Sequence, residues 1–154
     1  MMRLWMDSES AKSAGRQVRA SVRKIESEVS GQVLSRGTRA VNALRNAELE
    51  VLRGQRSGKV YRVPFTKKTT YQASAPGEPP ARRTGNLRMH WSGEVKYGKT
   101  IGNNVEVLAV LESNEIYSTY LEKGTKKMVP RPFVEKIKEK AKPEIEKIYN
   151  EPYT

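Results

Sequence analysis

The chain has 154 residues, which is enough for one domain and leaves little room for a second. Only 36% of its residues are apolar and 30% are charged, a balance that favours a small core completed by neighbouring subunits. The sequence has no cysteine, so disulfides, thiolate metal sites and thiol nucleophiles are excluded. Its net charge of +12 favours negatively charged partners, whereas no apolar run is long enough to span a membrane, and we expect action in the cytoplasm.

Residues 7–54 are predicted to form one long helix. Asp7 can cap its start and Gly54 can end it, whereas Gly31 and Gly37 weaken its middle, where we expect a bend or a break. If unbroken, the helix spans about 65 Å, more than the width of a compact domain of this size, so it should pack on a further surface. Its apolar residues recur in steps of three and four, which places them on one stripe. The stripe consists of Ala11, Ala14, Val18, Val22, Ile25, Val29 and Val33, and continues less regularly through Ala40, Ala43 or Leu44, Ala47 and Val51.

Residues 59–111 are predicted to form a small antiparallel sheet with a long loop at residues 66–86. The loop contains three prolines and two glycines without periodicity, and loops of about this length are usually functional or disordered. Residues 98–104 have the composition of a turn. Alternation of apolar and polar residues predicts strands at 59–65, 87–91, 94–97 and 105–111.

Residues 116–148 are predicted to form two helices, the first of which Gly124 closes. Pro132 suits the first turn of the final helix, and Pro143 inside that helix should kink or split it. The tail, residues 150–154, is expected to fray. The predicted fold class is therefore α+β, with a long N-terminal helix and a C-terminal helix packed on a small sheet. Apolar residues repeat along the final helix at Phe133, Ile137, Ala141, Ile145 and Ile148.

The sequence lacks the residues of the common catalytic sites. His90 is the only histidine and Asp7 the only aspartate, so neither a Ser–His–Asp nor a Cys–His arrangement is available, and metal clusters of the usual ligands are also out of reach. We interpret His90 as a structural or surface residue. The segment 98–100, Gly-Lys-Thr, resembles the end of a phosphate-binding loop but has strand-like surroundings. A glycosidase-type glutamate pair stays open without a feature that favours it, and we expect no enzyme and no cofactor.

Basic segments that alternate with aromatic residues are typical of nucleic-acid-binding surfaces. Tyr71, Trp91 and Tyr97 lie among such segments. The alternative is a positively charged protein that meets an acidic partner. We favour that alternative because the sequence contains no recognised nucleic-acid-reading motif.

Two stretches resemble signatures of a phage protein family. Residues 72–88 read QASAPGEPPARRTGNLR, and residues 117–133 read YSTYLEKGTKKMVPRPF. Both resemble blocks of the putative tail-component, or neck, family of long-tailed phages with HK-type heads, and their order and separation also match. The resemblance covers residues 59–148; Lys123 stands where an aromatic residue is common, and the N-terminal helix matches only in being helical.

The resemblance implies a structural virion protein at the head–tail junction. Its copies are expected to form a hexameric or similar ring through which DNA passes, and to join other connector and tail proteins after assembly in the host cytoplasm. The runner-up is a free-standing basic nucleic-acid-binding protein. Residues expected to contact a partner, or phosphates of passing DNA, are Pro76, Pro79, Pro80, Arg82, Arg83, Arg88 and Arg131, and the expected structural anchors are Tyr120, Gly124 and Phe133.

Overall fold

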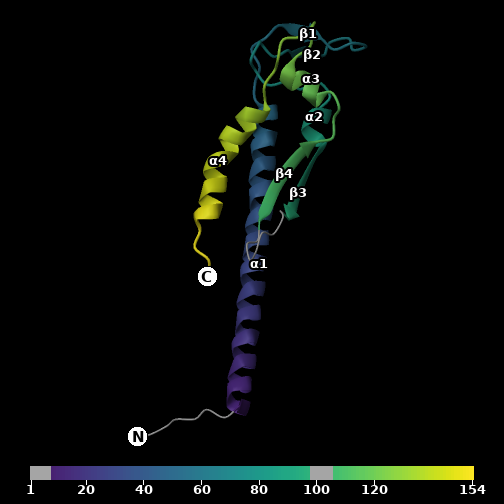
Figure 1. The fold of residues 1–154 in the computed structure, drawn as a ribbon. Helices are drawn as coiled ribbons and strands as arrows, with labels where there is room; N and C mark the ends of the chain where they lie inside the picture. The colour runs from purple at the N-terminus through teal and green to yellow at the C-terminus, as the bar shows by residue number, and fades with distance from the viewer. Residues whose placement is uncertain (1–7, 98–105) are drawn as a thin grey trace.

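The computed structural model of the chain describes residues 8–97 and 106–154, and it confirms the α+β class (Figure 1). Asp7 and the predicted turn at 98–104 lie outside the described residues. None of the described helices is long and apolar enough to cross a membrane. The elements in chain order are α1 (Ser8–Arg53), β1 (Val60–Arg62), β2 (Thr70–Gln72), α2 (Asn86–Met89), β3 (Trp91–Tyr97), β4 (Val107–Ser113), α3 (Ser118–Lys123) and α4 (Val134–Asn150).

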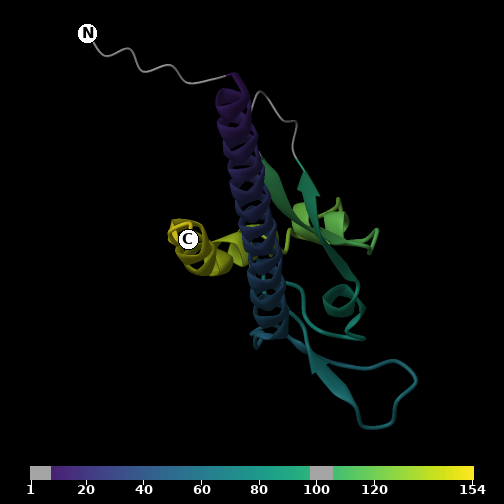
Figure 2. The ribbon, with the colours of Figure 1, turned by 90° about the horizontal axis from the view of Figure 1, so that it is seen from below.

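The described strands form two separate antiparallel hairpins, β1–β2 and β3–β4, instead of the single sheet that the alternation predicted. The β3–β4 hairpin packs on one side of α1, and α4 runs antiparallel to α1 on the other side (Figure 1). The β1–β2 hairpin projects away from the C-terminal end of α1 (Figure 2). The long helix therefore lies between the two packed layers and carries most of the core.

Helix α1 runs without a break through both of its central glycines, so the predicted interruption was wrong. A Cβ atom at Gly37 would lie 2.8 Å from Val107 Cγ1 and 3.0 Å from Val95 Cγ1. A Cβ atom at Gly93, on β3, would lie 2.5 Å from Val41 Cγ1. These two glycines lack a side chain because helix and hairpin approach each other closely at these points.

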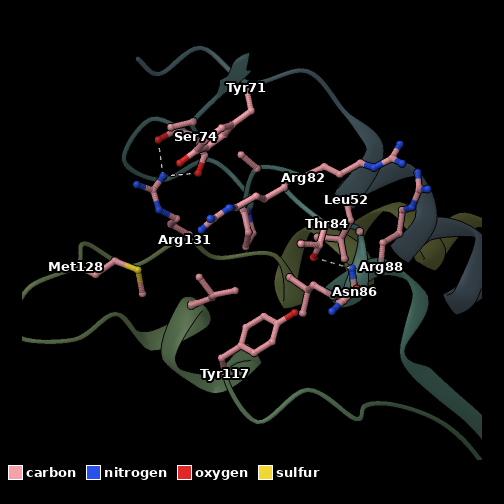
Figure 3. A pocket seen from close by; sticks show the side chains of 17 residues that line it. Leu52, Tyr71, Ser74, Arg82, Thr84, Asn86, Arg88, Tyr117, Met128 and Arg131 are labelled. Carbon is pink, nitrogen blue, oxygen red and sulfur yellow. Dashed lines mark hydrogen bonds between the residues drawn. The ribbon is translucent and has the colours of Figure 1, made fainter. Parts of the chain in front are cut away.

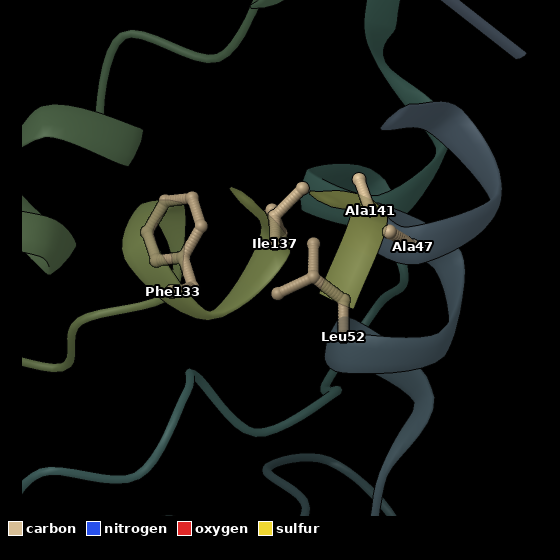
Figure 4. Packing of buried hydrophobic residues seen from close by; sticks show 5 residues of the cluster. All are labelled: Ala47, Leu52, Phe133, Ile137 and Ala141. Carbon is tan, nitrogen blue, oxygen red and sulfur yellow. The ribbon is translucent and has the colours of Figure 1, made fainter. Parts of the chain in front are cut away.

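The main hydrophobic core lies between the C-terminal half of α1 and the start of α4 (Figure 4). Phe133 is 1% exposed, and its ring meets that of Trp91 edge-on with centroids 6.1 Å apart, which confirms Phe133 as an anchor. Pro143 lies inside α4 but does not split it. The buried cluster consists of Ala47, Leu52, Phe133, Ile137 and Ala141.

Three local predictions were wrong. Residues 87–91 were predicted as a strand, but α2 begins after Gly85, whose φ of 93° starts a helical turn in which Met89 N donates to the Gly85 carbonyl. The loop 66–86 contains strand β2. The Tyr120 side chain is 57% exposed and is no core anchor, because Leu121 is the residue of α3 that faces the core cluster.

Gly124 acts as the predicted anchor of the segment between α3 and α4. Its φ is 75°, and a Cβ there would lie 2.8 Å from both the Met128 carbonyl oxygen and Pro130. Arg131 N donates to the Leu121 carbonyl at 2.8 Å, which closes the turn back onto α3. Only glycine fits this position without strain.

The C-terminal tail is held against α1, so the expected fraying was wrong. Arg36, buried at 5% exposure, donates to the Glu151 carbonyl at 2.6 Å, and its guanidinium lies 3.7 Å from the centre of the Tyr153 ring. Arg39 makes a two-pronged ion pair with the Glu151 carboxylate at 2.5 and 2.6 Å. Gln32 donates to the Thr154 carbonyl.

Candidate assembly site

The proline-rich loop is tied to the rest of the subunit by side chains from distant parts of the chain. The guanidinium of Arg56 donates to the Pro80 carbonyl at 3.1 and 3.2 Å. The Glu78 carboxylate accepts hydrogen bonds from the Ser57 hydroxyl and from the backbone N–H groups of Ser57 and Ala75, and these bonds lower the pKa of Glu78 to about 2. The loop thus has a defined path over the end of α1.

The loop, β2, α2 and α3 enclose a pocket of about 630 Å³ (Figure 3). Its volume is within the usual range for ligand and peptide sites. Four arginines line it, and none of its lining residues in the described chain is acidic. Its apolar lining includes Leu52, Leu87, Leu121 and Met128.

Two of the four arginines have uncommitted charges. In the described part of the chain, neither Arg82 nor Arg83 has an ion-pair or hydrogen-bond partner, and both side chains are exposed. The Tyr117 phenol lies on the other side of the pocket (Figure 3). Burial, the negative charge of Glu115 and a hydrogen bond to Glu115 raise the pKa of Tyr117. This arrangement is suited to a carboxylate attached to an apolar side chain.

Arg88 is turned toward a buried carboxylate on α1. Glu48 is fully buried, and desolvation raises its pKa to about 7 although Arg45 and Arg88 lower it. Glu48 also forms an ion pair with Arg45. Within the described residues, Oε1 of Glu48 and Nε of Arg88 are buried without a hydrogen-bond partner. The Arg88 side chain therefore interacts in part with the buried Glu48 inside the subunit.

The remaining predicted contact residues have internal roles or lie apart. The Arg131 guanidinium donates to the hydroxyl and carbonyl oxygens of Ser74 and to the Ala75 carbonyl, so it fastens the loop to the segment before α4. Pro79 and Pro80 are buried, and only Pro76 is exposed. The sequence analysis missed Tyr117, Met128 and Leu52 as lining residues, since their position depends on long-range packing.

A second candidate surface is the exposed part of α1, residues 9–31, which we call the arm. All its residues are exposed except Gly15, which is half-buried. The arm extends beyond the C-terminus of α4 (Figure 1). The exposed apolar side chains on its stripe are Val18 at 62%, Val22 at 47%, Ile25 at 58% and Val29 at 39%.

No family model, curated protein or solved structure matches this chain. Any function assigned to it therefore depends on its own residues and their arrangement. In the segments that the structure describes, no group of three or more His, Asp or Glu side chains is placed to hold a metal ion. The pocket and the arm are the two features best suited to binding other macromolecules.

Proposed function

We propose that this chain is a structural, non-enzymatic subunit of the head–tail junction of a tailed bacteriophage. Its copies form a ring, which we take to be a hexamer, that joins the tail to the connector proteins of the head. The blocks at residues 72–88 and 117–133 support this proposal through their resemblance to the phage neck family. The subunit then belongs to the virion, is assembled in the host cytoplasm and needs no cofactor.

The arm is the observation that carries this proposal. Its apolar stripe is the continuation of the α1 face that α4 and the C-terminal tail cover over residues 36–51. Burying one valine or isoleucine side chain contributes roughly 1.5–3 kcal/mol, and the arm leaves four of them exposed in a row. Continuous exposed apolar stripes mark interaction surfaces. We propose that a neighbouring copy of the chain covers the apolar stripe of the arm.

Ring geometry agrees with a projecting helix. Subunits related by rotation about one axis contact their neighbours through two different faces, so their arms would lie side by side. The stripe has small and β-branched residues, which allow close contact between helices. At roughly 3.6 residues per turn, Arg16, Arg19 and Arg23 lie together on a face of the arm that points away from the stripe, and in a ring they would form a positively charged lining around DNA.

The arginine-lined pocket would serve contacts with other proteins of the junction. Arg82 and Arg83 offer free guanidinium groups above an apolar floor. A connector or tail protein that presents a carboxylate next to an apolar side chain would satisfy both parts of the pocket. Because the loop is already tied down by Arg56 and Arg131, little ordering of the loop would oppose docking.

Light scattering and negative-stain images of the full-length chain test the ring. We expect the wild type to form rings with a central hole and Val22→Glu/Ile25→Glu to be monomeric, because two charges would be buried on the stripe. Ala20→Glu/Ser27→Glu adds the same charge on the opposite side of the arm and should leave rings intact.

Two results would contradict the connector proposal. One is a wild-type monomer that binds neither purified connector nor tail-tube proteins. The other is an equal effect of the two double variants on mass, because the stripe would then have no special role. Circular dichroism of each variant checks that its helices still form.

A basic nucleic-acid-binding protein is the second candidate function, and the net charge of +12 favours it. It predicts tight duplex binding by monomers, with an affinity that falls steeply as salt is added. Shallow salt dependence would count against it.

A further inference from the structure

The β1–β2 hairpin has features that the connector function does not explain. Tyr61 pairs with Tyr71 across the two strands, and their rings stack with centroids 5.9 Å apart. Beyond the strands, Val63 N donates to the Thr69 carbonyl at 2.8 Å and Thr66 Oγ1 donates to the Val63 carbonyl at 2.7 Å. These bonds give the projecting tip a defined shape (Figure 2).

The hairpin is strongly basic. Residues 59–77 contain four basic residues and no acidic one. Of the four, Arg62 donates to the Lys67 carbonyl at 2.7 Å, and none makes an ion pair with a described residue. The four, Lys59, Arg62, Lys67 and Lys68, all have exposed side chains.

An exposed aromatic side chain, Phe65, lies at the tip of the β1–β2 hairpin. Phe65 is fully exposed, at 108% of the reference area, and follows the exposed Pro64. Its φ is 63°, in the left-handed region that bulky residues rarely adopt. With its side chain fully exposed, Phe65 has no packing within the subunit to offset this strain. The backbone thus holds an aromatic ring out toward solvent.

We propose that the β1–β2 hairpin contacts duplex DNA. Two-stranded ribbons fit DNA grooves, and Arg62 before the tip and Lys67 and Lys68 after it would neutralise phosphates along the groove edges. Phe65 would insert as a wedge at a base step, as apolar side chains of DNA-bending proteins do. An acidic protein surface would also attract these basic residues, and the binding experiment distinguishes the two kinds of partner.

This inference goes beyond the ring, because a single subunit has the whole hairpin. Fluorescence anisotropy of a short labelled duplex of mixed sequence, titrated with the full-length chain at several salt concentrations, tests it. Lys67→Ala/Lys68→Ala should weaken binding about tenfold and reduce the slope of log affinity against log salt by about two. Lys126→Ala/Lys127→Ala removes the same charge from the exposed turn before Pro130 and should change affinity less than about threefold.

The insertion of Phe65 between bases is measured in a separate experiment. A duplex with 2-aminopurine, whose fluorescence rises when a base is unstacked, should respond to the wild type and not to Phe65→Ala, while the salt slope of that variant stays near the wild-type value. Equal losses for the two lysine pairs would overturn the proposal, because binding would then reflect net charge alone. Absent duplex binding, or binding only to an acidic protein, would overturn it too. None of these results depends on ring formation, so they are distinguishable from failure of the connector proposal.

Discussion

The two halves of α1 have the same periodic pattern and opposite environments. From residue 32 to Arg53, the stripe lies against α4 and the C-terminal tail, and Ala40 and Ala47 on it are 1% and 5% exposed. In the arm, Val18 and Ile25 occupy equivalent positions of the same repeat and are 62% and 58% exposed. The helical period continues from one half into the other, although the stripe is less regular in the C-terminal half. Only the presence of a covering element distinguishes them.

This difference shows that an amphipathic pattern specifies a helix face but not the partner that covers it. The chain supplies a cover of 17 residues, α4, for a helix of 46 residues. The arm has four exposed valine and isoleucine side chains on its stripe, and no described element covers them. Variants in each half of α1 test how independent the two halves are.

The largest expected effect on stability is at Phe133, in the core that covers the C-terminal half of α1. Phe133→Ala should lower the free energy of unfolding by about 3–5 kcal/mol, because it removes a side chain that is 1% exposed and packs on Trp91. Val22→Ala in the arm should change the same quantity by less than about 0.5 kcal/mol. Urea denaturation at low protein concentration measures both, and Phe133→Leu gives a milder test if the alanine variant does not fold. Similar losses of unfolding free energy at the two sites would show that the two halves of α1 do not differ in their packing.

Burial of Glu48 should make the C-terminal half of α1 sensitive to pH. Its pKa is raised from 4.5 to about 7 by desolvation, so the folded state resists ionisation. The contribution of Glu48 to stability should be complete below about pH 4.5 and fall by about 3 kcal/mol as the pH rises to 7, because this carboxyl group ionises first in the unfolded chain. Glu48→Gln should flatten this part of the profile. Chemical denaturation at several pH values measures it, and an unchanged slope in the variant would contradict the assignment.

Local sequence signals predicted the elements well where local forces decide them. The long helix is predicted at 7–54 and observed at Ser8–Arg53. The expectation that Phe133 is an anchor depends on the resemblance and on the turn into the last helix, and Phe133 is buried in the core cluster. Residues 87–91 alternate like a strand, but the turn that starts at Gly85 makes their first part a helix. Alternation over so few residues is a weak signal against a local turn.

The candidate site was predicted less completely. Arg82 and Arg83 do line a pocket, but the role of Arg131 depends on Ser74, 57 residues away in the chain. The burial of Glu48 depends on packing between α1 and the elements around it, which no local pattern encodes. The tail was expected to fray, yet Arg36 and Arg39 hold it from more than 100 residues away. Long-range hydrogen bonds of this kind set the site and leave no trace in local composition.

A smaller effect is expected at Gly37. An added Cβ would lie 2.8 Å from Val107 Cγ1 and 3.0 Å from Val95 Cγ1, and β-branched side chains have little freedom to move away. Gly37→Ala should therefore destabilise the subunit by about 1–3 kcal/mol despite the better helix propensity of alanine. Thermal unfolding measures the loss. A gain in stability would mean that α1 and the β3–β4 hairpin pack less closely than described.

The smallest effect, and the sharpest test of the comparison, is at Gly31, six residues before Gly37 on the same helix. No atom lies within 4 Å of an added Cβ there, and the position faces away from the apolar stripe. Gly31→Ala should therefore stabilise the arm helix by about 0.5–1 kcal/mol and leave ring mass unchanged. Because the residues around Gly31 in the arm are exposed, the arm should open separately from the core, so the gain should appear as slower amide hydrogen exchange in residues 20–31 and not as a higher unfolding midpoint. A shift of the midpoint would instead show that the arm and the core unfold as one cooperative unit, and the stripe would then need no second molecule to keep it helical.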